Sequence, residues 1–244
     1  MNSILLIGQS NMAGRGFINE AKETNPSHIY ILRNGRWQSF FRPVNPDRVF
    51  SGVCLAESFA EAYVKKYGVD IGLIPCADGG TELDLWQEGS LLYDNAVNNA
   101  RLAMRTSKIV GILWHQGEAD STKEFASTYK ERFEKMISAM QRDLGIDVPV
   151  IIGGLGDFLA DYGDGRLKEY YLINNALKEI AKDNDNIAFV SAENLKSNPD
   201  NLHFCSESLY EFGLRYFAEF DRLYKLENST DVKEDKERTE MEKL

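Results

Sequence analysis

Cysteine and long apolar runs are both scarce in this sequence. Its three cysteines, Cys54, Cys76 and Cys205, are widely spaced and form no CxxC pair. Neither a disulfide framework nor a zinc knuckle is therefore expected. The longest apolar stretches, such as residues 4–7 and 109–114, have the length of a strand and fall far short of the roughly 20 residues that span a bilayer. We expect no association with a membrane.

Positive charge is also in short supply. The 28 Lys and Arg residues are outnumbered by 38 Asp and Glu residues, which gives a formal net charge of −10. Because nucleic-acid phosphates bind to basic surfaces, we exclude nucleic acid as a partner. A neutral ligand such as a sugar suits an acidic protein better. The sequence says nothing of oligomeric state.

No basic segment and no small-residue cleavage site precede the first apolar run. We therefore expect a cytoplasmic protein, although a chain whose leader had been removed would look the same, so secretion stays open. With 43% hydrophobic residues, the chain can bury the core of one domain. We assign residues 1–226 to this domain. Residues 227–244 are almost wholly polar, and they predict a disordered tail or a solvated helix.

Apolar runs of strand length alternate with helical patterns along the domain. This alternation predicts βαβ units and a central, mostly parallel sheet of about five strands flanked by helices. The five runs are residues 3–7, 71–76, 109–114, 148–153 and 187–190, and the helical patterns cover residues 54–66, 91–104, 121–140, 167–182 and 206–224.

Two local patterns add detail to this outline. The runs 29–33 and 37–41 flank Asn34-Gly35, which predicts a small antiparallel hairpin that interrupts the main pattern. Ser121 and Glu124 have the spacing of a capping box, which predicts that a helix starts there.

Polar loops follow four of the predicted strands. They are Gly8-Gln9-Ser10-Asn11-Met12, Asp78-Gly79-Gly80-Thr81, His115-Gln116-Gly117-Glu118 and Asp200-Asn201-Leu202-His203-Phe204. In open parallel sheets, ligands bind beyond the carboxyl ends of the strands. We therefore expect all four loops on one edge.

Three of these loop residues fit the needs of acyl transfer. A serine hydroxyl becomes a nucleophile when an imidazole takes its proton, and the imidazole needs a carboxylate to orient it. Ser10, His203 and Asp200 supply this set. The oxyanion of the intermediate needs hydrogen-bond donors worth about 3 kcal/mol each, and the candidates are the N–H groups of Ser10 and Gly80 and the side-chain amide of Gln116.

Four motifs together carry a family resemblance. They are GQSNMAGRG at 8–16, GGT at 79–81 followed by Trp86, WHQGE at 114–118, and DNLHF at 200–204. In this order they resemble the sialate O-acetylesterase and acetylxylan esterase branch of the SGNH hydrolases. The resemblance implies a three-layer flavodoxin-like fold, a cofactor-free acetylesterase, and Ser10 and His203 as catalytic residues.

The resemblance makes Gln116 the candidate for the oxyanion donor and leaves the carboxylate that orients His203 open. The usual Gly-x-Asn-Asp block of SGNH hydrolases is replaced here by His-Gln-Gly-Glu, so Gln116 takes the place of the asparagine that donates to the oxyanion. Either Asp200 or Glu118 is the carboxylate that orients His203. We favour Asp200, because a three-residue turn directs Asp and His side chains at each other.

Further residues of these segments are candidates for substrate binding, namely Gln9, Asn11, Arg15, Thr81 and Trp86. Arg15 is expected either to bind a substrate carboxylate or to pair with an acidic neighbour. Trp86 is either a platform for a sugar or a packed lid residue, and packing is favoured.

A metal site is the remaining interpretation to weigh. His115 and Glu118 lack the helical spacing of a zinc protease and have no obvious third ligand. We expect His115 to be structural, and we expect no metal and no cofactor.

The sequence thus predicts a serine esterase that removes acetyl groups from a carbohydrate such as acetylated xylan or O-acetyl sialic acid. One alternative is a non-catalytic carbohydrate-binding protein on the same fold. The other is an esterase or thioesterase for a different acyl donor.

Overall fold

The apolar runs form a single seven-stranded sheet in the computed structural model, which describes residues 1–224. The strand order is β3-β2-β4-β1-β5-β6-β7. All neighbouring strands are parallel except the antiparallel pair β2–β3. The strands are β1 (Asn2–Gly8), β2 (Ile29–Arg33), β3 (Arg36–Ser39), β4 (Ile71–Pro75), β5 (Lys108–His115), β6 (Val150–Gly153) and β7 (Ile187–Val190).

The hairpin is where the sheet differs from the sequence-based outline. The prediction of a mostly parallel sheet flanked by helices is confirmed, but the hairpin extends this sheet instead of interrupting it, because β2 pairs in parallel with β4. Ile29 and Ile31 of β2 are fully buried in the core. The sheet therefore has seven strands where the apolar runs suggested about five.

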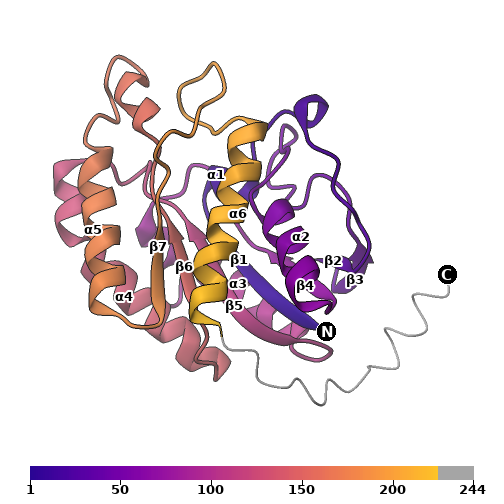
Figure 1. Ribbon diagram of the computed structural model, residues 1–244. Coiled ribbons are helices and arrows are strands. Elements are labelled where there is room, and N and C mark those ends of the chain that lie inside the picture. The colour runs from indigo at the N-terminus through magenta and orange to yellow at the C-terminus, as the bar shows by residue number, and fades with distance from the viewer. Residues whose placement is uncertain (225–244) are drawn as a thin grey trace.

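Helices cover both faces of the sheet. Figure 1 shows α2 (Ala56–Tyr67) and α6 (Ser206–Leu223) side by side on one face. The other face carries α3 (Leu91–Ala103), α4 (Lys123–Leu144) and α5 (Tyr170–Asp183). Successive residues of a strand point to opposite faces, so Leu6 packs in the layer of α2 and α6, and Ile7 packs in the layer of α3, α4 and α5.

The start of α4 corrects one predicted cap. The hydroxyl of Thr122, not that of Ser121, accepts the N–H of Phe125 at 3.3 Å. Ser121 instead donates to the carbonyl of Gly117 at 2.9 Å. The hydroxyl of Ser121 is therefore held by the preceding loop, and the helix begins one residue later.

Helix α5 begins later than predicted, at Tyr170 and not at residue 167. Among residues 1–224, no helix combines the length and the apolar character that crossing a membrane requires. The predicted domain end at residue 226 and the charged segment 227–244 lie outside the described residues.

The carboxyl ends of the three central strands meet at one edge. Gly8 at the end of β1 lies opposite His115 at the end of β5. A Cβ on Gly8 would lie 2.1 Å from the carbonyl oxygen of His115, and its φ is +130°, so only glycine fits this close approach. The chain then turns sharply into the short helix α1 (Ser10–Ala13).

Candidate active site

Ser10 begins α1 directly after the turn. Its side chain is nearly buried, with 7% of the residue exposed, and its Oγ lies 3.0 Å from Nε2 of His203. As the first residue of a helix, Ser10 has an N–H group with no acceptor inside that helix. The nucleophile and base candidates, 193 residues apart in sequence, are thus within hydrogen-bonding distance.

A tight turn fixes the position of His203. The Oδ1 atom of Asp200 accepts the N–H groups of Leu202 and His203 at 2.9 and 3.0 Å, and Asn201 adopts a left-handed φ of +51°, which asparagine tolerates better than most residues. The other carboxylate oxygen of Asp200 lies 2.7 Å from Nδ1 of His203. Ser10, His203 and Asp200 therefore form one continuous chain of hydrogen bonds.

The surroundings of Asp200 keep it ionised. Burial by itself raises the pKa of a carboxyl group, but the N–H groups of His203 and Leu202 and the imidazole of His203 outweigh this effect. The pKa of Asp200 consequently lies below its usual value. An ionised Asp200 holds the Nδ1 proton of His203, which leaves Nε2 free to accept a proton from Ser10.

Glu118 does not reach His203. Its Oε1 accepts the side-chain amide of Asn11 at 2.5 Å. The same amide of Asn11 contacts the carbonyl of Leu202 at 3.2 Å, and the Asn11 oxygen accepts the N–H of Phe204 at 3.0 Å. Asn11, predicted to bind substrate, is 1% exposed and instead joins α1 to both neighbours of His203.

His115 lies in the core beside this network. Its Nε2 is 3.2 Å from the carbonyl of Gly154, and its Nδ1 is 3.8 Å from Glu118. Burial lowers the pKa of His115, and its ring packs edge-on against Phe204 and Phe212. Within residues 1–224, no three His, Cys, Asp or Glu side chains are grouped so that they could hold a metal ion.

The structure corrects the assignment of Gln116 to the oxyanion hole. Its amide nitrogen donates to the carbonyl of Thr81 at 3.0 Å and to Asp120 at 2.6 Å, and its oxygen accepts the hydroxyl of Tyr129 at 3.0 Å. Gln116 is fully buried. Both of its N–H groups are therefore committed, and neither is available to an oxyanion.

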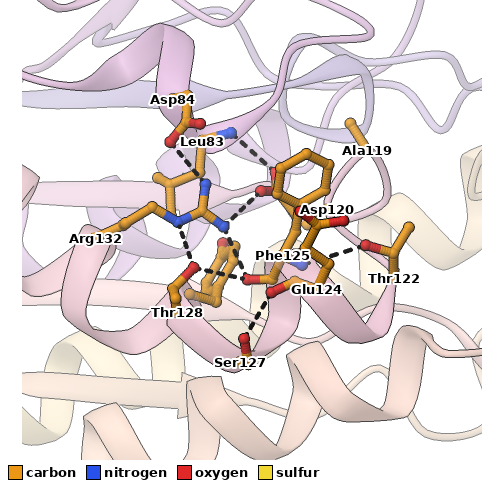
Figure 2. A network of polar contacts seen from close by, with 12 residues as sticks. Leu83, Asp84, Ala119, Asp120, Thr122, Glu124, Phe125, Ser127, Thr128 and Arg132 are labelled. Carbon is orange, nitrogen blue, oxygen red and sulfur yellow. Dashed lines mark hydrogen bonds and ion pairs between the residues drawn. The ribbon is translucent and has the colours of Figure 1, made fainter.

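A buried carboxylate explains this orientation of Gln116. Asp120 is 0% exposed and also accepts the N–H of Leu83 at 2.9 Å and the guanidinium of Arg132 at 3.0 Å. Figure 2 shows Arg132 of α4 reaching Asp84 and Asp120 together. This network ties the loop after β5 to α4, and it uses the side chain that the motif suggested for catalysis.

The glycine pair after β4 supplies the remaining oxyanion candidate. A Cβ built on Gly79 would lie 3.3 Å from Cβ of Ser10, so this turn packs directly against the serine. Gly80 follows with a left-handed φ of +79°, and a Cβ there would meet nothing within 4 Å. The N–H of Gly80 thus belongs to an open turn beside Ser10.

Thr81 and Trp86 are structural, contrary to their assignment as substrate-binding residues. Trp86 is fully buried, packs edge-on against Trp114 and donates its indole N–H to the hydroxyl of Thr81 at 3.1 Å. That hydroxyl donates to the carbonyl of Asp78 at 2.8 Å. The favoured packing interpretation of Trp86 is therefore correct, and no face of its ring is free for a sugar.

Arg15 and Gln9 are also engaged within the protein. Arg15 makes a bidentate pair with Asp47 at 2.9 and 2.6 Å, and both side chains are 4% exposed. Of the two roles predicted for Arg15, the structure shows the pairing with an acidic neighbour. The side-chain oxygen of Gln9 lies 3.5 Å from the N–H of Ala119, which links the loops after β1 and β5.

A groove of about 670 Å³ opens beside the triad. Sequence reasoning missed most of its wall, because these residues carry no motif and come from loops far apart in the chain. The polar composition of residues 42–48 indicates a loop, yet nothing in it identifies Asp47 as the partner of Arg15. Residues that line the groove include Arg15, Phe17, Phe50, Asn198, Asp200 and His203.

Comparison with known proteins identifies the family of the chain. Residues 1–222 match the model of a family described as carbohydrate esterase, sialic acid-specific acetylesterase. The chain belongs to this family. As a member of the family it is a carbohydrate O-acetylesterase, and hence a carboxylic ester hydrolase that acts on acetylated carbohydrate.

Similar proteins extend the comparison. The chain is 28% identical over 234 residues, 86% of each chain, to a probable carbohydrate esterase from Arabidopsis thaliana. The solved structure of that protein has a TM-score of 0.79 and 27% identity, and the match covers 90% of this chain and 98% of the other.

Two solved structures of lower sequence identity share the fold. NanS has a TM-score of 0.72 and 17% identity over 90% of this chain and 96% of its own. A carbohydrate acetylesterase from Xanthomonas citri has a TM-score of 0.67 and 17% identity over 91% of this chain and 56% of its own. These likenesses confirm the predicted α/β fold with a mostly parallel sheet flanked by helices.

Proposed function

We propose that this carbohydrate esterase acts through a Ser10–His203–Asp200 triad and an acetyl-enzyme. One observation carries the proposal: Oγ of Ser10 is 3.0 Å from Nε2 of His203, and Nδ1 of His203 is 2.7 Å from Asp200. These distances match what a general base needs to take the proton of a serine nucleophile.

The reaction has two halves. Oγ of Ser10 attacks the acetyl carbonyl carbon as His203 takes the hydroxyl proton. The tetrahedral intermediate then collapses, the bond to the sugar oxygen breaks, and His203 gives its proton to that oxygen. Water repeats these steps on the acetyl-Ser10 ester, passing one proton to His203 and then to Ser10, and acetic acid leaves.

Two backbone groups stabilise the oxyanion in this proposal. The N–H of Ser10 has no acceptor within its helix, and the N–H of Gly80 lies in the turn that packs against Ser10. Such donors act on the charge that develops in the transition state, at about 3 kcal/mol each. Gln116 has no part in this, because its amide is held by Thr81 and Asp120.

The geometry of the site favours an acetylesterase over a non-catalytic carbohydrate-binding protein and over an esterase for long acyl chains. A carbohydrate-binding protein without catalysis has no need of a complete nucleophile, base and carboxylate chain. An esterase for long acyl chains needs an apolar channel at the nucleophile, whereas Ser10 is 7% exposed and is flanked by the Gly79 turn. A short acyl group such as acetyl fits this setting better.

Hydrolysis of p-nitrophenyl acetate, butyrate and octanoate tests the proposal. We expect acetate to be cleaved fastest, and we expect Ser10→Ala to lose at least about 10³-fold in kcat while it keeps its circular dichroism spectrum. Ser127→Ala, a change of an exposed serine of α4, is the matched control and keeps full activity. Retained activity in Ser10→Ala rejects the nucleophile, and an inert wild type favours the binding protein.

A further inference from the structure

The peptide group between Gly79 and Gly80 is the part of the proposed oxyanion hole that lies outside α1. Its N–H is that of Gly80, and its carbonyl is that of Gly79. Because a trans peptide group is planar, its N–H and its C=O point in opposite directions. A contact that fixes the carbonyl of Gly79 therefore also fixes the direction in which the N–H of Gly80 points.

Arg48 makes such a contact. Its Nη2 donates to the carbonyl oxygen of Gly79 at 2.9 Å and to Oδ1 of Asp78 at 2.8 Å. Its Nη1 donates to the carbonyl oxygen of Asp47 at 2.8 Å. The guanidinium group is planar and rigid, so these three hydrogen bonds hold it in one orientation against the turn after β4.

The charge of Arg48 adds to the effect of its position. Arginine stays protonated in proteins, and a hydrogen bond from an ionised donor is stronger than one from a neutral donor. Hydrogen bonds in a chain polarise one another. The bond that Arg48 donates to the carbonyl of Gly79 consequently strengthens the N–H of Gly80 as a donor to an oxyanion.

Two neighbours of Arg48 hold the same turn from the loop between β3 and α2. Asp47 accepts the N–H of Gly79 through Oδ2 at 2.9 Å. Asn45 is 5% exposed and pairs with both backbone groups of Ala77, because its amide donates to the carbonyl and its oxygen accepts the N–H, each at 2.9 Å. This loop therefore fixes the turn at several backbone groups.

Exposure distinguishes Arg48 from these neighbours. Its side chain is 41% exposed, and that of Asp78 is 35% exposed. Ion pairs between exposed side chains contribute little to the stability of a fold. A change of Arg48 should therefore affect the oxyanion turn without unfolding the protein.

We propose that Arg48 is a positioning residue of the oxyanion hole, which aims and polarises the N–H of Gly80. The inference rests on the proposed function, in which this N–H stabilises the tetrahedral intermediate. Arg48 acts through the Gly79–Gly80 peptide and not by contact with the reacting atoms. It belongs to none of the four sequence motifs, so local sequence does not identify it.

Arg48→Ala tests the proposal with p-nitrophenyl acetate as substrate. Loss of a whole oxyanion donor costs about 10²- to 10³-fold, and a misaimed donor keeps part of its effect. We expect kcat/KM to fall about 10- to 30-fold, while the urea concentration at the midpoint of unfolding stays at the wild-type value. Arg222→Ala removes an arginine of α6 whose side chain is 59% exposed, and this control keeps both quantities.

A transition-state analogue shows whether the loss arises at the oxyanion. Oγ of Ser10 adds to the carbonyl carbon of trifluoroacetone, the hydroxyl proton passes to His203, and the carbonyl oxygen becomes the oxyanion of a hemiketal. We expect the inhibition constant to rise in Arg48→Ala by the factor by which kcat/KM falls. An inhibition constant that stays at the wild-type value overturns the inference, and so does an unchanged kcat/KM.

Asp78→Asn separates the bond to the turn from the ion pair. The asparagine oxygen still accepts from Arg48, and Arg48 keeps its bond to Gly79, so we expect less than about a threefold loss of kcat/KM. A loss as large as that of Arg48→Ala would place the effect in the ion pair and overturn the role of the bond to Gly79.

The wild type separates a failure of this inference from a failure of the proposed function. A wild type that neither cleaves p-nitrophenyl acetate nor is inhibited by trifluoroacetone rejects the proposed function. An active wild type with an equally active Arg48→Ala variant rejects only the role of Arg48.

Discussion

Asp200 and Glu118 are carboxylates with different hydrogen-bond partners, and they therefore have different roles in the site. Asp200 receives two backbone N–H groups and the imidazole of His203. Glu118 is 2% exposed, bonds to Asn11 through one oxygen and leaves the other without a partner. Of these two carboxylates, Asp200 is the one bonded to the imidazole of His203, whereas Glu118 lies 3.8 Å from the imidazole of His115.

Substitution of each carboxylate separates these roles. We expect Asp200→Asn to lower kcat for p-nitrophenyl acetate by about 10³- to 10⁴-fold, because the amide donates to Nδ1 and fixes the wrong tautomer. Glu118→Gln keeps its size and the oxygen that Asn11 needs, so we expect less than about a tenfold loss. Steady-state kinetics on both variants checks this, and the reverse order of losses contradicts the assignment.

Asn11 acts between two elements, since it connects α1 to the loop that carries His203. Its three hydrogen bonds reach Glu118 and the backbone on either side of His203. Ser10 and His203 come from opposite ends of the chain, and among the described contacts the only other hydrogen bond from a side chain of α1 to this loop is that of Ser10 with His203 itself.

Asn11→Ala should loosen this link without removing a reacting group. We expect kcat to fall about 10- to 100-fold with KM nearly unchanged, because a small displacement of His203 from Ser10 weakens proton transfer. The pH profile of kcat should also shift, which a purely structural loss of stability would not cause. Asn98→Ala, on the exposed face of α3, is the control, and a change in KM alone would contradict the positioning role.

The contact between α4 and the loop after β5 depends on a buried charge. Asp120 is fully buried, and Arg132 supplies its positive partner (Figure 2). Gln116 and the N–H of Leu83 complete its hydrogen bonds. Removal of the cation leaves a carboxylate that water cannot solvate.

We expect Arg132→Ala to lower the free energy of unfolding by about 3 kcal/mol, as for other broken buried pairs. Arg142→Ala in the same helix removes an arginine whose side chain is 60% exposed, and it should cost less than about 1 kcal/mol. Urea unfolding of both variants measures the difference. Equal losses would show that the burial of Asp120 does not matter.

Stability of the entire chain against acid should depend on Asp47. Burial raises the pKa of this carboxyl group, but the hydrogen bonds from Arg15 and Ser51, the charge of Arg15 and the N–H of Gly79 hold it below the usual value. A folded-state pKa that is depressed contributes stability above the unfolded pKa of about 3.9, and this contribution is lost as the pH falls through the folded value.

The difference in unfolding free energy between the wild type and Asp47→Asn should therefore be largest near neutral pH and shrink below about pH 4. We expect about 3 kcal/mol at pH 7, because the substitution leaves Arg15 buried without its partner. Urea unfolding at several pH values measures it, with Asp185→Asn, a change of an exposed aspartate between α5 and β7, as the control. A difference that is constant with pH would contradict the assignment.

Local patterns were enough for the strands, the helices and the order of the four loops. Period-two and period-3.6 apolar spacing reports which face of an element is buried, and parallel topology brings the carboxyl ends of the strands to one edge. The pairing of Asp200 with His203 also follows from local sequence, because a turn of three residues leaves few other geometries.

Local patterns did not predict the contacts of a side chain whose possible partners are distant in the sequence. The amide of Gln116 turns to Asp120 because Arg132 and Leu83 hold that carboxylate in the core. Trp86 packs against Trp114, which comes from another strand.

The amino-acid order determined the fold class and predicted Ser10 and His203 as nucleophile and base, since each prediction depends on neighbours a few residues away or on the fixed geometry of a parallel sheet. It left the carboxylate open between Asp200 and Glu118, although it favoured Asp200. Tertiary structure decided which polar side chains remain free for chemistry. Arg15 meets Asp47 and the groove forms between loops only after the chain has folded. Hydrogen bonds and ion pairs are satisfied by whichever partners packing brings within about 3 Å, and that set is a property of the whole molecule.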